Sequence, residues 1–416
     1  MHILVVTQYF WPENFRINDV AATLVERGHA VTVVTGVPNY PRGRFFQGYG
    51  IFKKCREQYR GCQVIHIPLV PRGNSGPLNL VLNYLSFAAA ATLFTPLLSD
   101  RSFDAILVCQ LSPATVGIPA MAFKRLRKLP LVLWVLDLWP DSLFATGAIR
   151  SRVVLRLVGQ MVSLIYRSSD LILASSRTFI PEIERRGGRS GSIHYFPNWA
   201  EKFDARAPID GVPLRVDLPD GGFRIMFAGN IGQAQSFETI IAAAERLKVM
   251  PDIHWMIAGD GRRREWLEQQ VRDRALQKVV HVLGSYPPDR MPALFAQADA
   301  LLVTLSRDPL FALTAPGKLQ SYLASGKMIV GAIDGEGRRV LEESGAAVTC
   351  DPEDPCALAD AVMTAYRMPA CLRQSMGESG RKYCSEHFNR ESLMDQLESL
   401  ILGAVVSNAP RERVAG

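Results

Sequence analysis

Residues 229–232, with the sequence GNIG, have the residue types and spacing that could hold a phosphate group. They follow an apolar run, residues 225–228, that is typical of a strand, and a helical pattern begins near Ser236, which we expect to be its N-cap. Such a turn presents free backbone N–H groups, and the helix dipole adds partial positive charge there. The third glycine of the dinucleotide-binding fingerprint is absent, so a purely structural glycine turn is the alternative.

Lys318 is the second group that could bind a phosphate. It follows Pro316 and Gly317 at the beginning of a predicted helix, residues 319–324. A cation beside a helix N-terminus is unfavourable for the helix dipole unless an anion compensates it. We therefore predict that Lys318 binds an anionic ligand and is not simply solvated.

Two carboxylates come directly after predicted strands. Asp137 ends the apolar run of residues 131–136, and we expect it to be a polar group that faces a ligand cleft; a helix cap or a turn is the alternative. Asp260 lies where dinucleotide enzymes place the acid that binds the ribose. An NAD-dependent enzyme therefore remains an alternative, although the missing third glycine disfavours it.

Asn14 and Arg16 follow the first predicted strand. The guanidinium of Arg16 could bind a phosphate group of a ligand through its fork of N–H groups, and a surface ion pair is the alternative.

The composition limits the class of protein. The chain has 416 residues, of which 48% are hydrophobic and 21% are charged, and this is typical of a globular protein with two domains. A net charge of +7 would suit nucleic acid, anionic lipid or a polyanionic substrate. No compact basic block with interleaved aromatic residues occurs, so nucleic acid is the least supported partner.

The cysteines and histidines predict no metal site. The seven cysteines include no CxxC pair and suit a reducing cytosol, with Cys350 and Cys356 interpreted as structural. The seven histidines show no ligand spacing, so we expect no metal held by histidines. The chain enters a strand at its first residues, and we expect no signal peptide.

Short apolar runs alternate with helical patterns along the whole chain, which predicts parallel sheets covered by helices on both faces. The predicted strands are residues 3–6, 31–34, 64–67, 105–108, 131–136, 171–174 and 193–196, then 225–228, 253–257, 279–283, 300–303, 328–331 and 347–348. Residues 205–222 are rich in Pro, Asp and Gly and are the predicted linker. We therefore predict an α/β fold of two doubly wound domains that face each other, with ligand at the carboxyl ends of their strands.

Residues 76–99 form a long helical pattern, and no residue between Arg72 and Asp100 is charged. The length would allow a membrane span, but a span would separate strands of one sheet, so we reject it. Polar residues at helical spacing predict one narrow polar face: Asn79, Asn83 and Ser86. Two interpretations remain, a buried core helix or a helix that lies in a membrane interface together with the basic amphipathic residues 150–167.

Six segments carry a resemblance to a known family. They are TQYFWPENFRINDVAATLVERGHAVTVVTGVPNYPRG (residues 7–43), VLDLWPDS (135–142), FPNWAE (196–201), FAGNIGQAQ (227–235), AGDG (258–261) and APGKLQSYLASGK (315–327). In this order they resemble family 4 glycosyltransferases, and specifically the branch related to L-fucosamine and colanic-acid transferases of bacterial surface-polysaccharide synthesis. The resemblance covers nearly the whole chain.

The resemblance implies the GT-B fold, in which two Rossmann-like domains close around a nucleotide-sugar, usually without a metal. It implies an acceptor-side domain over residues 1–204, the linker 205–222 and a nucleotide-sugar-binding domain over residues 223–388. Residues 389–416 would form a C-terminal helix, which we expect to pack back on the first domain, and a tail.

The sequence also departs from the family. Many members carry two glutamates eight positions apart, whereas the matching positions here are Leu313 and Ser321. The Arg and Lys that commonly bind the diphosphate match Asn230 and Gln235, and the paired glycines of the N-terminal loop match residues 14–15. Ribose recognition and the charge balance of the phosphates must therefore come from other residues.

The resemblance, together with these substitutions, leads to a set of expected site residues. Asp137 is the expected catalytic residue, and Asn14, Arg16 and Asn39 are expected on the acceptor side. The expected donor-binding residues are Gly229, Asn230, Ile231, Gly232, Gln235, Arg262, Leu283, Gly284, Pro316, Gly317, Lys318 and Glu336. Among these, Lys318 is the leading candidate for the phosphate, with residues 262–264 behind it, and Glu336 is the candidate for the ribose.

The predicted function is transfer of a sugar from a nucleotide-sugar to a lipid-linked saccharide of a bacterial surface polysaccharide (O-antigen, capsule or exopolysaccharide). We expect a UDP-linked donor, with an N-acetylated deoxyhexosamine among the candidate sugars, retention of configuration, and neither a cofactor nor a metal. The expected location is cytoplasmic, peripheral on the inner face of the cytoplasmic membrane. A nucleotide-sugar 2-epimerase of the same fold is one alternative, disfavoured by the apolar residues 76–99; a non-catalytic scaffold is another, favoured by the missing glutamates.

Overall fold

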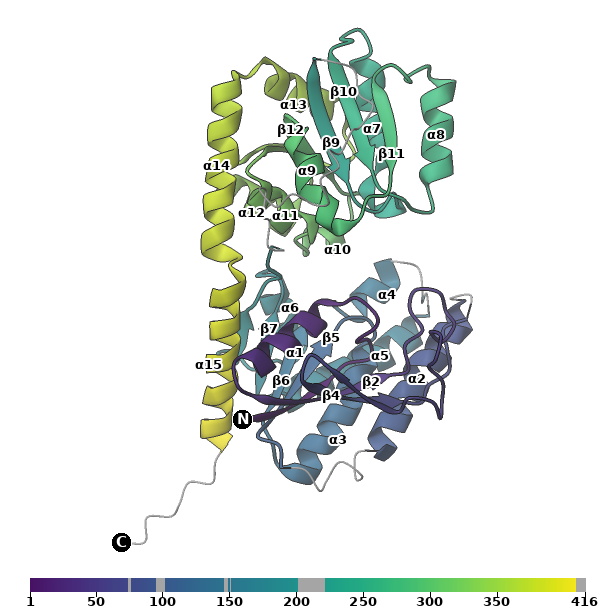
Figure 1. Cartoon of the computed structure of the whole chain (residues 1–416), viewed down its shortest axis with the longest axis vertical. Coiled ribbons are helices and arrows are strands. Elements are labelled where there is room, and N and C mark those ends of the chain that lie inside the picture. The colour runs from purple at the N-terminus through teal and green to yellow at the C-terminus, as the bar shows by residue number, and fades with distance from the viewer. Residues whose placement is uncertain (74–75, 95–101, 146–148, 150, 201–220, 409–416) are drawn as a thin grey trace, which may run out of the picture. The chain divides into compact units, whose positions relative to one another are not determined.

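The computed structural model describes residues 1–73, 76–94, 102–145, 149, 151–200 and 221–408 (Figure 1). The chain divides into two compact units, the first made of Met1–Pro197 and Glu391–Gly416 and the second of Asn198–Arg390. The predicted linker, residues 205–222, lies outside the described residues except for its last two, and so does the tail after residue 408.

An eight-stranded sheet forms the centre of the first unit, in the order β3-β4-β2-β1-β5-β6-β7-β8. All neighbouring strands are parallel except β3, which is antiparallel to β4. The strands are β1 His2–Val6, β2 Ala30–Gly36, β3 Arg56–Tyr59, β4 Cys62–Ile67, β5 Ala105–Gln110, β6 Leu131–Val135, β7 Leu171–Ala174 and β8 Ile193–Tyr195. The seven predicted strands are confirmed. The edge strand β3 was not predicted, because its sequence REQY is polar and carries no apolar signal.

Helices cover both faces of this sheet. They are α1 Arg16–Glu26, α2 Pro77–Phe94, α3 Gly117–Arg127, α4 Asp141–Ala145, α5 Arg152–Ser168, α6 Phe179–Arg185 and α15 Arg390–Asn408, with a 3-10 turn, η2, at Ala114–Val116. Helix α3 packs against both α2 and α5 (Figure 1). The C-terminal helix α15 belongs to the first unit, where the guanidinium of Arg27 binds the carboxylates of Asp395 at 2.6 Å and Glu398 at 3.1 Å.

The second unit has a wholly parallel sheet in the order β11-β10-β9-β12-β13-β14. Its strands are β9 Phe223–Ala228, β10 Ile253–Ala258, β11 Val280–Gly284, β12 Ala300–Thr304, β13 Met328–Ala332 and β14 Ala347–Cys350. Its helices are η3 Gln233–Gln235, α7 Phe237–Arg246, α8 Arg264–Asp273, η4 Pro288–Arg290, α9 Met291–Ala296, α10 Pro309–Ala312, α11 Lys318–Ser325, α12 Gly335–Ser344, α13 Pro355–Arg367 and α14 Ala370–His387. All six predicted strands are confirmed.

Successive residues of the strands enter two separate apolar clusters, one on each face of this sheet. Phe227 and Trp255 belong to one cluster, and their neighbours Met226 and Met256 belong to the other. Burial on both faces explains why the strands read as continuous apolar runs.

Helix α2 turns its polar residues inward. The amide of Asn83 is buried, donating to the carbonyl of Val70 at 2.6 Å and accepting from Gln8 Nε2 at 2.7 Å, and Ser86 Oγ accepts from the Val70 N–H at 2.9 Å. The opposite face exposes large apolar side chains: Leu78, Val81, Leu82, Leu85 and Leu93. Helix α2 is therefore only partly buried, because Phe87 and Ala88 lie in the core while its most apolar face is exposed. Within the described part of the chain, no helix has the length and apolarity of a membrane span.

Candidate functional site

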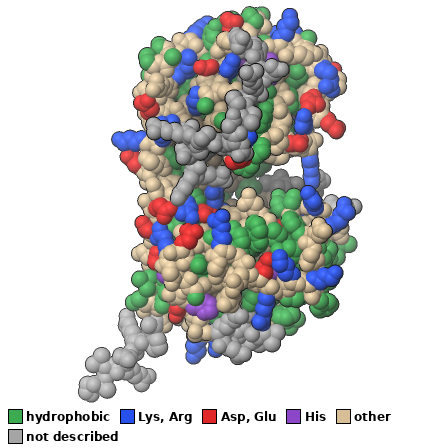
Figure 2. Space-filling view, viewed as in Figure 1, with side chains coloured by type: hydrophobic (Ala, Val, Ile, Leu, Met, Phe, Trp, Pro, Cys, Tyr) green, Lys and Arg blue, Asp and Glu red, His purple; other side chains and the backbone are tan. Residues whose placement is uncertain are grey.

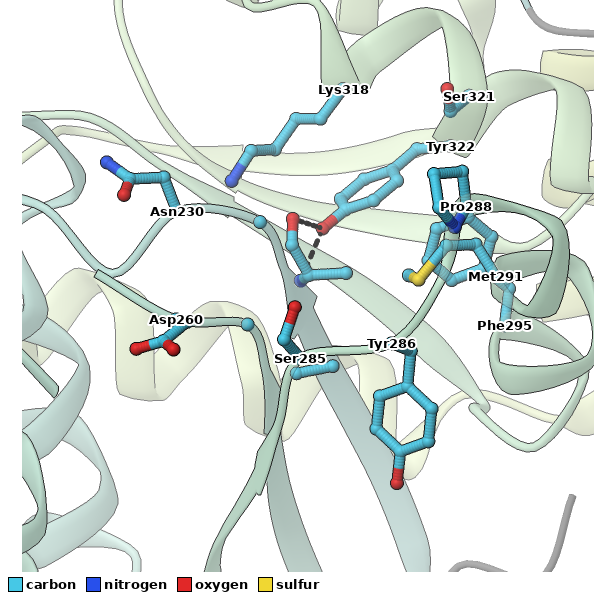
Figure 3. A pocket seen from close by; sticks show the side chains of 14 residues that line it. Asn230, Asp260, Ser285, Tyr286, Pro288, Met291, Phe295, Lys318, Ser321 and Tyr322 are labelled. Carbon is cyan, nitrogen blue, oxygen red and sulfur yellow. Dashed lines mark hydrogen bonds between the residues drawn. The ribbon is translucent and has the colours of Figure 1, made fainter. Parts of the chain in front are cut away.

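A pocket of about 370 Å³ opens in the second unit at the carboxyl ends of β9, β10 and β11 (Figure 3). The ends of these strands and the residues that follow supply a mostly backbone wall, whereas α9 and α11 supply side chains. The residues that line it include Gly229, Asn230, Gly259, Asp260, Ser285, Tyr286, Phe295, Lys318, Ser321 and Tyr322. The sequence predicted ligand binding at this edge of the sheet.

Close approach of the strand ends explains the glycines. A Cβ added at Gly259 would lie 1.8 Å from the carbonyl oxygen of Gly229, and Gly259 has a φ of +153°. The N–H of Gly229 donates to Ala258 O at 2.9 Å, and that of Ile231 donates to Asp260 O at 2.8 Å. Two of the N–H groups that the GNIG turn was predicted to offer a phosphate are therefore already bonded.

The turn also does not lead directly into a helix. The short helix η3 intervenes, and α7 begins only at Phe237. Ser236 occupies the N-cap position, but it has a left-handed conformation with a φ of 45° and makes no side-chain capping bond. Its Oγ instead lies 2.8 Å from Thr239 Oγ1, so the predicted N-cap position of Ser236 is confirmed, without a side-chain bond to the helix backbone.

Lys318 places an ammonium group inside the pocket. Although part of the residue is exposed, Nζ is buried, and it has no hydrogen-bond partner among the described residues. It lies 3.6 Å from the centre of the Phe227 ring, and the side chain extends toward the side of the pocket where Asn230 lies (Figure 3). A Cβ added at Gly229 would come within 3.1 Å of Nζ, so the glycine lets the lysine approach the backbone.

Burial lowers the pKa of Lys318 to about 7. The same residue begins α11, whose positive end disfavours a cation. A desolvated ammonium without a counter-ion is costly, and a bound anion would remove that cost. The geometry therefore suits the predicted role of Lys318 as an anion-binding group.

Tyr322 fixes α11 against the end of β9. Its Oη accepts from the Ala228 N–H at 2.7 Å and donates to the Ala228 carbonyl at 3.1 Å, the two dashed lines of Figure 3. Because Tyr322 is one helical turn after Lys318, these bonds hold the start of the helix at the pocket. Ser321, at a position where many family 4 members have a glutamate, lines the same pocket.

Several predicted donor residues have structural roles. Ile231 is buried in the apolar core. The carbonyl of Gln235 accepts from Thr304 Oγ1 at 2.6 Å, while its Oε1 is buried without a partner among the described residues. Gly232 lies next to Asn230, because a Cβ there would come within 2.4 Å of Asn230 Nδ2.

The three arginines after Asp260 differ in their contacts. Arg263 binds the carboxylate of Glu238, and Arg264 binds that of Glu268 at 2.9 Å. Arg262 is exposed and makes no ion pair within the described residues, so it is the most available cation of residues 262–264. None of the three lines the pocket.

The remaining predicted donor residues also lie outside the pocket lining. Leu283 packs against the core, and the carbonyl of Gly284 accepts from the Gly259 N–H at 2.7 Å. Pro316 and Gly317 precede α11, and Gly317 is its N-cap residue. Glu336 is fully buried on α12, and its two oxygens accept from Arg339 Nη2 at 2.6 and 2.5 Å, so this carboxylate already has a partner.

In the first unit, Asp137 follows β6. Its Oδ2 accepts from Trp139 Nε1 at 3.2 Å and from Ser142 Oγ at 3.1 Å, and burial raises the pKa of the carboxyl group. Since Ser142 lies in the first turn of α4, these bonds agree with the alternative interpretation of Asp137 as a turn former. They do not exclude a contact between the carboxylate and a ligand.

The predicted acceptor-side residues separate into one buried and two surface positions. Asn39 is buried; its Nδ2 donates to Val37 O at 2.9 Å and its Oδ1 accepts from the Arg72 N–H at 3.1 Å. Asn39 therefore ties two loops together. Asn14 is exposed, and Arg16 is the half-buried first residue of α1.

A second group of residues was not predicted from the sequence, because its members come from distant segments. Arg72 lies over the rings of Tyr9, Tyr40 and Tyr84, with 5.8, 5.1 and 6.0 Å from its guanidinium carbon to the ring centres. Arg72 Nη1 also donates to Tyr9 Oη at 2.9 Å. We call these four residues the arginine–tyrosine cluster.

Glu13 lies beside this cluster. It is buried, and its Oε1 accepts from the N–H groups of Asn39 at 2.7 Å and Tyr40 at 2.6 Å. Its Oε2 has no partner among the described residues, and burial raises the pKa of the carboxyl group to about 7. Across the described ranges, no group of three or more His, Cys, Asp or Glu residues could hold a metal.

Two family models match most of the chain. The model described as "Glycosyl transferase 4-like domain" matches residues 14–199, and the model "Glycosyl transferases group 1" matches residues 222–368. The first match covers nearly all of the first unit before α15, and the second covers the sheet and pocket of the second unit.

Two relatives have 28% sequence identity with the chain. One is the putative colanic acid biosynthesis glycosyl transferase WcaI of Escherichia coli K12, with 97% of this chain and 100% of that protein aligned. The other is the probable glycosyltransferase WbjE of Pseudomonas aeruginosa, with 70% of this chain and 72% of that protein aligned.

Solved structures with the same fold have lower identity. Anabaena HepE in complex with UDP has a TM-score of 0.70 at 18% identity, covering 97% of this chain and 100% of that chain. Sucrose-phosphate synthase of Thermosynechococcus elongatus has a TM-score of 0.72 at 14% identity, covering 98% and 99%. At these identities the likeness shows the fold.

Proposed function

Since the chain belongs to the family 4 glycosyltransferases and has their GT-B fold, we propose that it transfers a sugar from a UDP-linked donor to a lipid-linked saccharide in bacterial surface-polysaccharide synthesis. The names of WcaI and WbjE support the reaction class, and that of WcaI supports the polysaccharide. The structure of HepE with UDP supports the nucleotide.

The observation that carries this proposal is the buried ammonium of Lys318. A diphosphate in the pocket would supply the counter-ion that Nζ lacks among the described residues, and the bond would be charge-assisted. The pocket volume of about 370 Å³ also suits a small-molecule ligand. Neither of the two family glutamates is needed for this contact, since Lys318 itself lines the pocket.

The proposed chemistry breaks the bond between the anomeric carbon and the diphosphate and forms one to an acceptor hydroxyl, whose proton passes to the leaving diphosphate. Negative charge develops on the leaving diphosphate, and Lys318 would stabilise it in the transition state. Asp137 is the proposed polar group of the first unit that contacts the sugar. We propose that no metal or other cofactor takes part, and retention of configuration remains the expectation from the family.

We further propose that the first unit rests on a membrane. Helix α5 also exposes apolar side chains, Val153, Leu157 and Leu164, together with Arg156. Figure 2 shows hydrophobic side chains gathered on the first unit in the region where Figure 1 places α2. Apolar side chains with flanking arginines suit the interface of a bilayer with anionic lipids, where a lipid-linked acceptor would lie.

The test is to incubate the protein with a panel of UDP-sugars, N-acetylated deoxyhexosamines included, and with undecaprenyl-diphosphate saccharides. We expect lipid with the mass of one added sugar, only when donor and acceptor are both present. A changed sugar nucleotide in the absence of acceptor would identify a 2-epimerase instead. Neither product, with intact UDP binding, would identify a non-catalytic subunit.

A further inference from the structure

The charge of Arg72 has no counter-ion in the part of the first unit that is described. Its guanidinium contacts three tyrosine rings and one hydroxyl, its Nε is buried without a partner, and no carboxylate of the described residues forms an ion pair with it. Glu13 is near enough for Arg72 to lower the pKa of its carboxyl group, but burial dominates and raises that pKa overall. Tyrosine rings stabilise a cation only partly, so a half-buried arginine in this setting favours binding of an anion.

The backbone around Arg72 is held firmly. A Cβ added at Gly43 would lie 1.7 Å from the carbonyl of Gly73, and the Gly73 N–H donates to the carbonyl of Gly43 at 2.9 Å. The segment that carries Arg72 is thereby packed against the loop that carries Tyr40. Glu13 holds the same loop through the N–H groups of Asn39 and Tyr40. The cluster is therefore built by specific contacts and not by a chance approach of side chains.

The cluster also adjoins the exposed apolar helix. Tyr84 is a residue of α2, and its neighbours Leu82 and Leu85 are 44% and 53% exposed. Tyr9, Tyr40 and Arg72 follow the carboxyl ends of β1, β2 and β4, which are adjacent in the sheet. An anion-binding group and an apolar surface thus share one helix, which suits a ligand with a phosphate next to a hydrocarbon chain.

We propose that Arg72 binds the phosphate of the lipid-linked acceptor, so that the arginine–tyrosine cluster recognises an isoprenyl-type diphosphate ester. The planar guanidinium suits phosphate oxygens, and the three rings keep it oriented. This inference rests on the proposed function, since only a lipid-linked acceptor combines the two chemistries in a substrate. Phospholipid headgroups carry phosphate as well, and the test separates the two sources.

The test is a calorimetric titration of the full chain with geranyl diphosphate, a soluble isoprenyl diphosphate, in saturating UDP so that the Lys318 pocket is occupied. We expect Arg72→Gln to weaken this binding by about 10- to 100-fold, the scale of a charge-assisted contact. Arg72→Lys keeps the charge without the planar fork, so its affinity for geranyl diphosphate should lie between those of the wild type and Arg72→Gln. This variant keeps the test valid if Arg72→Gln unfolds. The matched control is Arg60→Gln, which removes an exposed arginine over a single tyrosine ring.

Three outcomes decide the inference, and a fourth concerns the proposed function. Weaker binding of geranyl diphosphate in Arg72→Gln, with unchanged UDP affinity and unchanged binding of geraniol, supports it. Equal geranyl diphosphate affinities in wild type, Arg72→Gln and Arg72→Lys overturn it. A loss seen only with phosphatidylglycerol vesicles assigns Arg72 to lipid headgroups and overturns the acceptor assignment. Absence of UDP binding in the wild type would count against the proposed function and is read separately from these three.

Discussion

The Lys318 pocket of the second unit and the arginine–tyrosine cluster of the first are both candidate anion-binding sites, but they are built from different residues. Both follow the carboxyl ends of parallel strands, and both hold a cation without a counter-ion among the described residues. In the pocket a lysine approaches glycine backbone, and burial lowers its pKa to about 7. In the cluster an arginine, which stays protonated, lies among tyrosine rings. The comparison teaches that one site can lose its charge near neutral pH, whereas the other cannot.

The largest expected effect is that of Asp137→Asn, which should lower turnover without changing donor binding. Asp137→Asn should lower turnover by about a hundredfold or more, the scale of one positioned polar group, and should leave UDP affinity nearly unchanged. Steady-state rates and UDP calorimetry on the same sample measure the two quantities. Glu182→Gln is the control and should keep full turnover, since Glu182 is a partly exposed carboxylate of α6 paired with Arg185. Parallel losses of activity and thermal stability in Asp137→Asn would show that the carboxylate only supports the turn before α4.

The exposed apolar surface is a second difference between the units. Among the exposed large hydrophobic residues of the described chain, only Val249 and Leu372 belong to the second unit. Replacing Leu82 and Leu85 with Glu should release the protein from vesicles that contain anionic lipid, because it places charge on the contact surface. Each arginine near the surface contributes about 1 kcal/mol, which salt screens, so the wild type should bind less strongly as salt rises and keep a residual apolar association.

The control for this experiment is the double replacement of Val249 and Leu372 with Glu, which should leave vesicle binding intact. Since Leu82 and Leu85 are about half exposed, the free energy of unfolding should change by less than about 1 kcal/mol. Flotation and circular dichroism are measured together. Unfolding of the Leu82 and Leu85 variant would assign α2 to the core, and unchanged flotation would remove it from the membrane contact.

A smaller expected effect is the pH dependence of UDP affinity, because Lys318 can lose its charge near neutral pH whereas an arginine cannot. With a pKa of about 7 in the free protein, Lys318 loses its proton as the pH rises, whereas a bound diphosphate favours the protonated form. UDP affinity should therefore be nearly constant below about pH 7 and should fall toward pH 8.5, by at most about tenfold per pH unit. Lys318→Ala should bind UDP weakly with a flatter pH profile. Equal profiles for the two proteins would show that Lys318 is not the group that titrates.

The sequence predicted the strands of both units better than the residues of the candidate sites. Strands buried on both faces are apolar throughout, so their positions could be predicted, whereas the polar edge strand β3 could not. Gly229 and Lys318 were found because each lies next to a recognisable turn or helix start. Two N–H groups of the GNIG turn that were predicted to be free are bonded, because the strand ends bond to one another across the sheet. Ser236 is the N-cap of α7 as predicted, but its side chain makes no capping bond.

Two features depend on tertiary structure that periodicity does not contain. The polar face of α2 was identified correctly, but only the buried partners Gln8 and Val70 show that it turns inward and leaves the leucines outside. The arginine–tyrosine cluster joins residues 9, 40, 72 and 84, which no local motif connects. A lone arginine in a sequence gives no indication that its counter-ion is missing.

The most direct test of the central claim is a calorimetric titration of wild type and Lys318→Ala with UDP at pH 7. Loss of one charge-assisted hydrogen bond costs about 1.5–3 kcal/mol, so we expect UDP to bind the variant about 10- to 150-fold more weakly. Lys327→Ala is the matched control, because Lys327 is a half-buried lysine of the same unit that donates to Ala296 O at 3.0 Å and lies outside the pocket. Equal UDP affinities in wild type and Lys318→Ala would contradict the assignment of this pocket to the donor diphosphate.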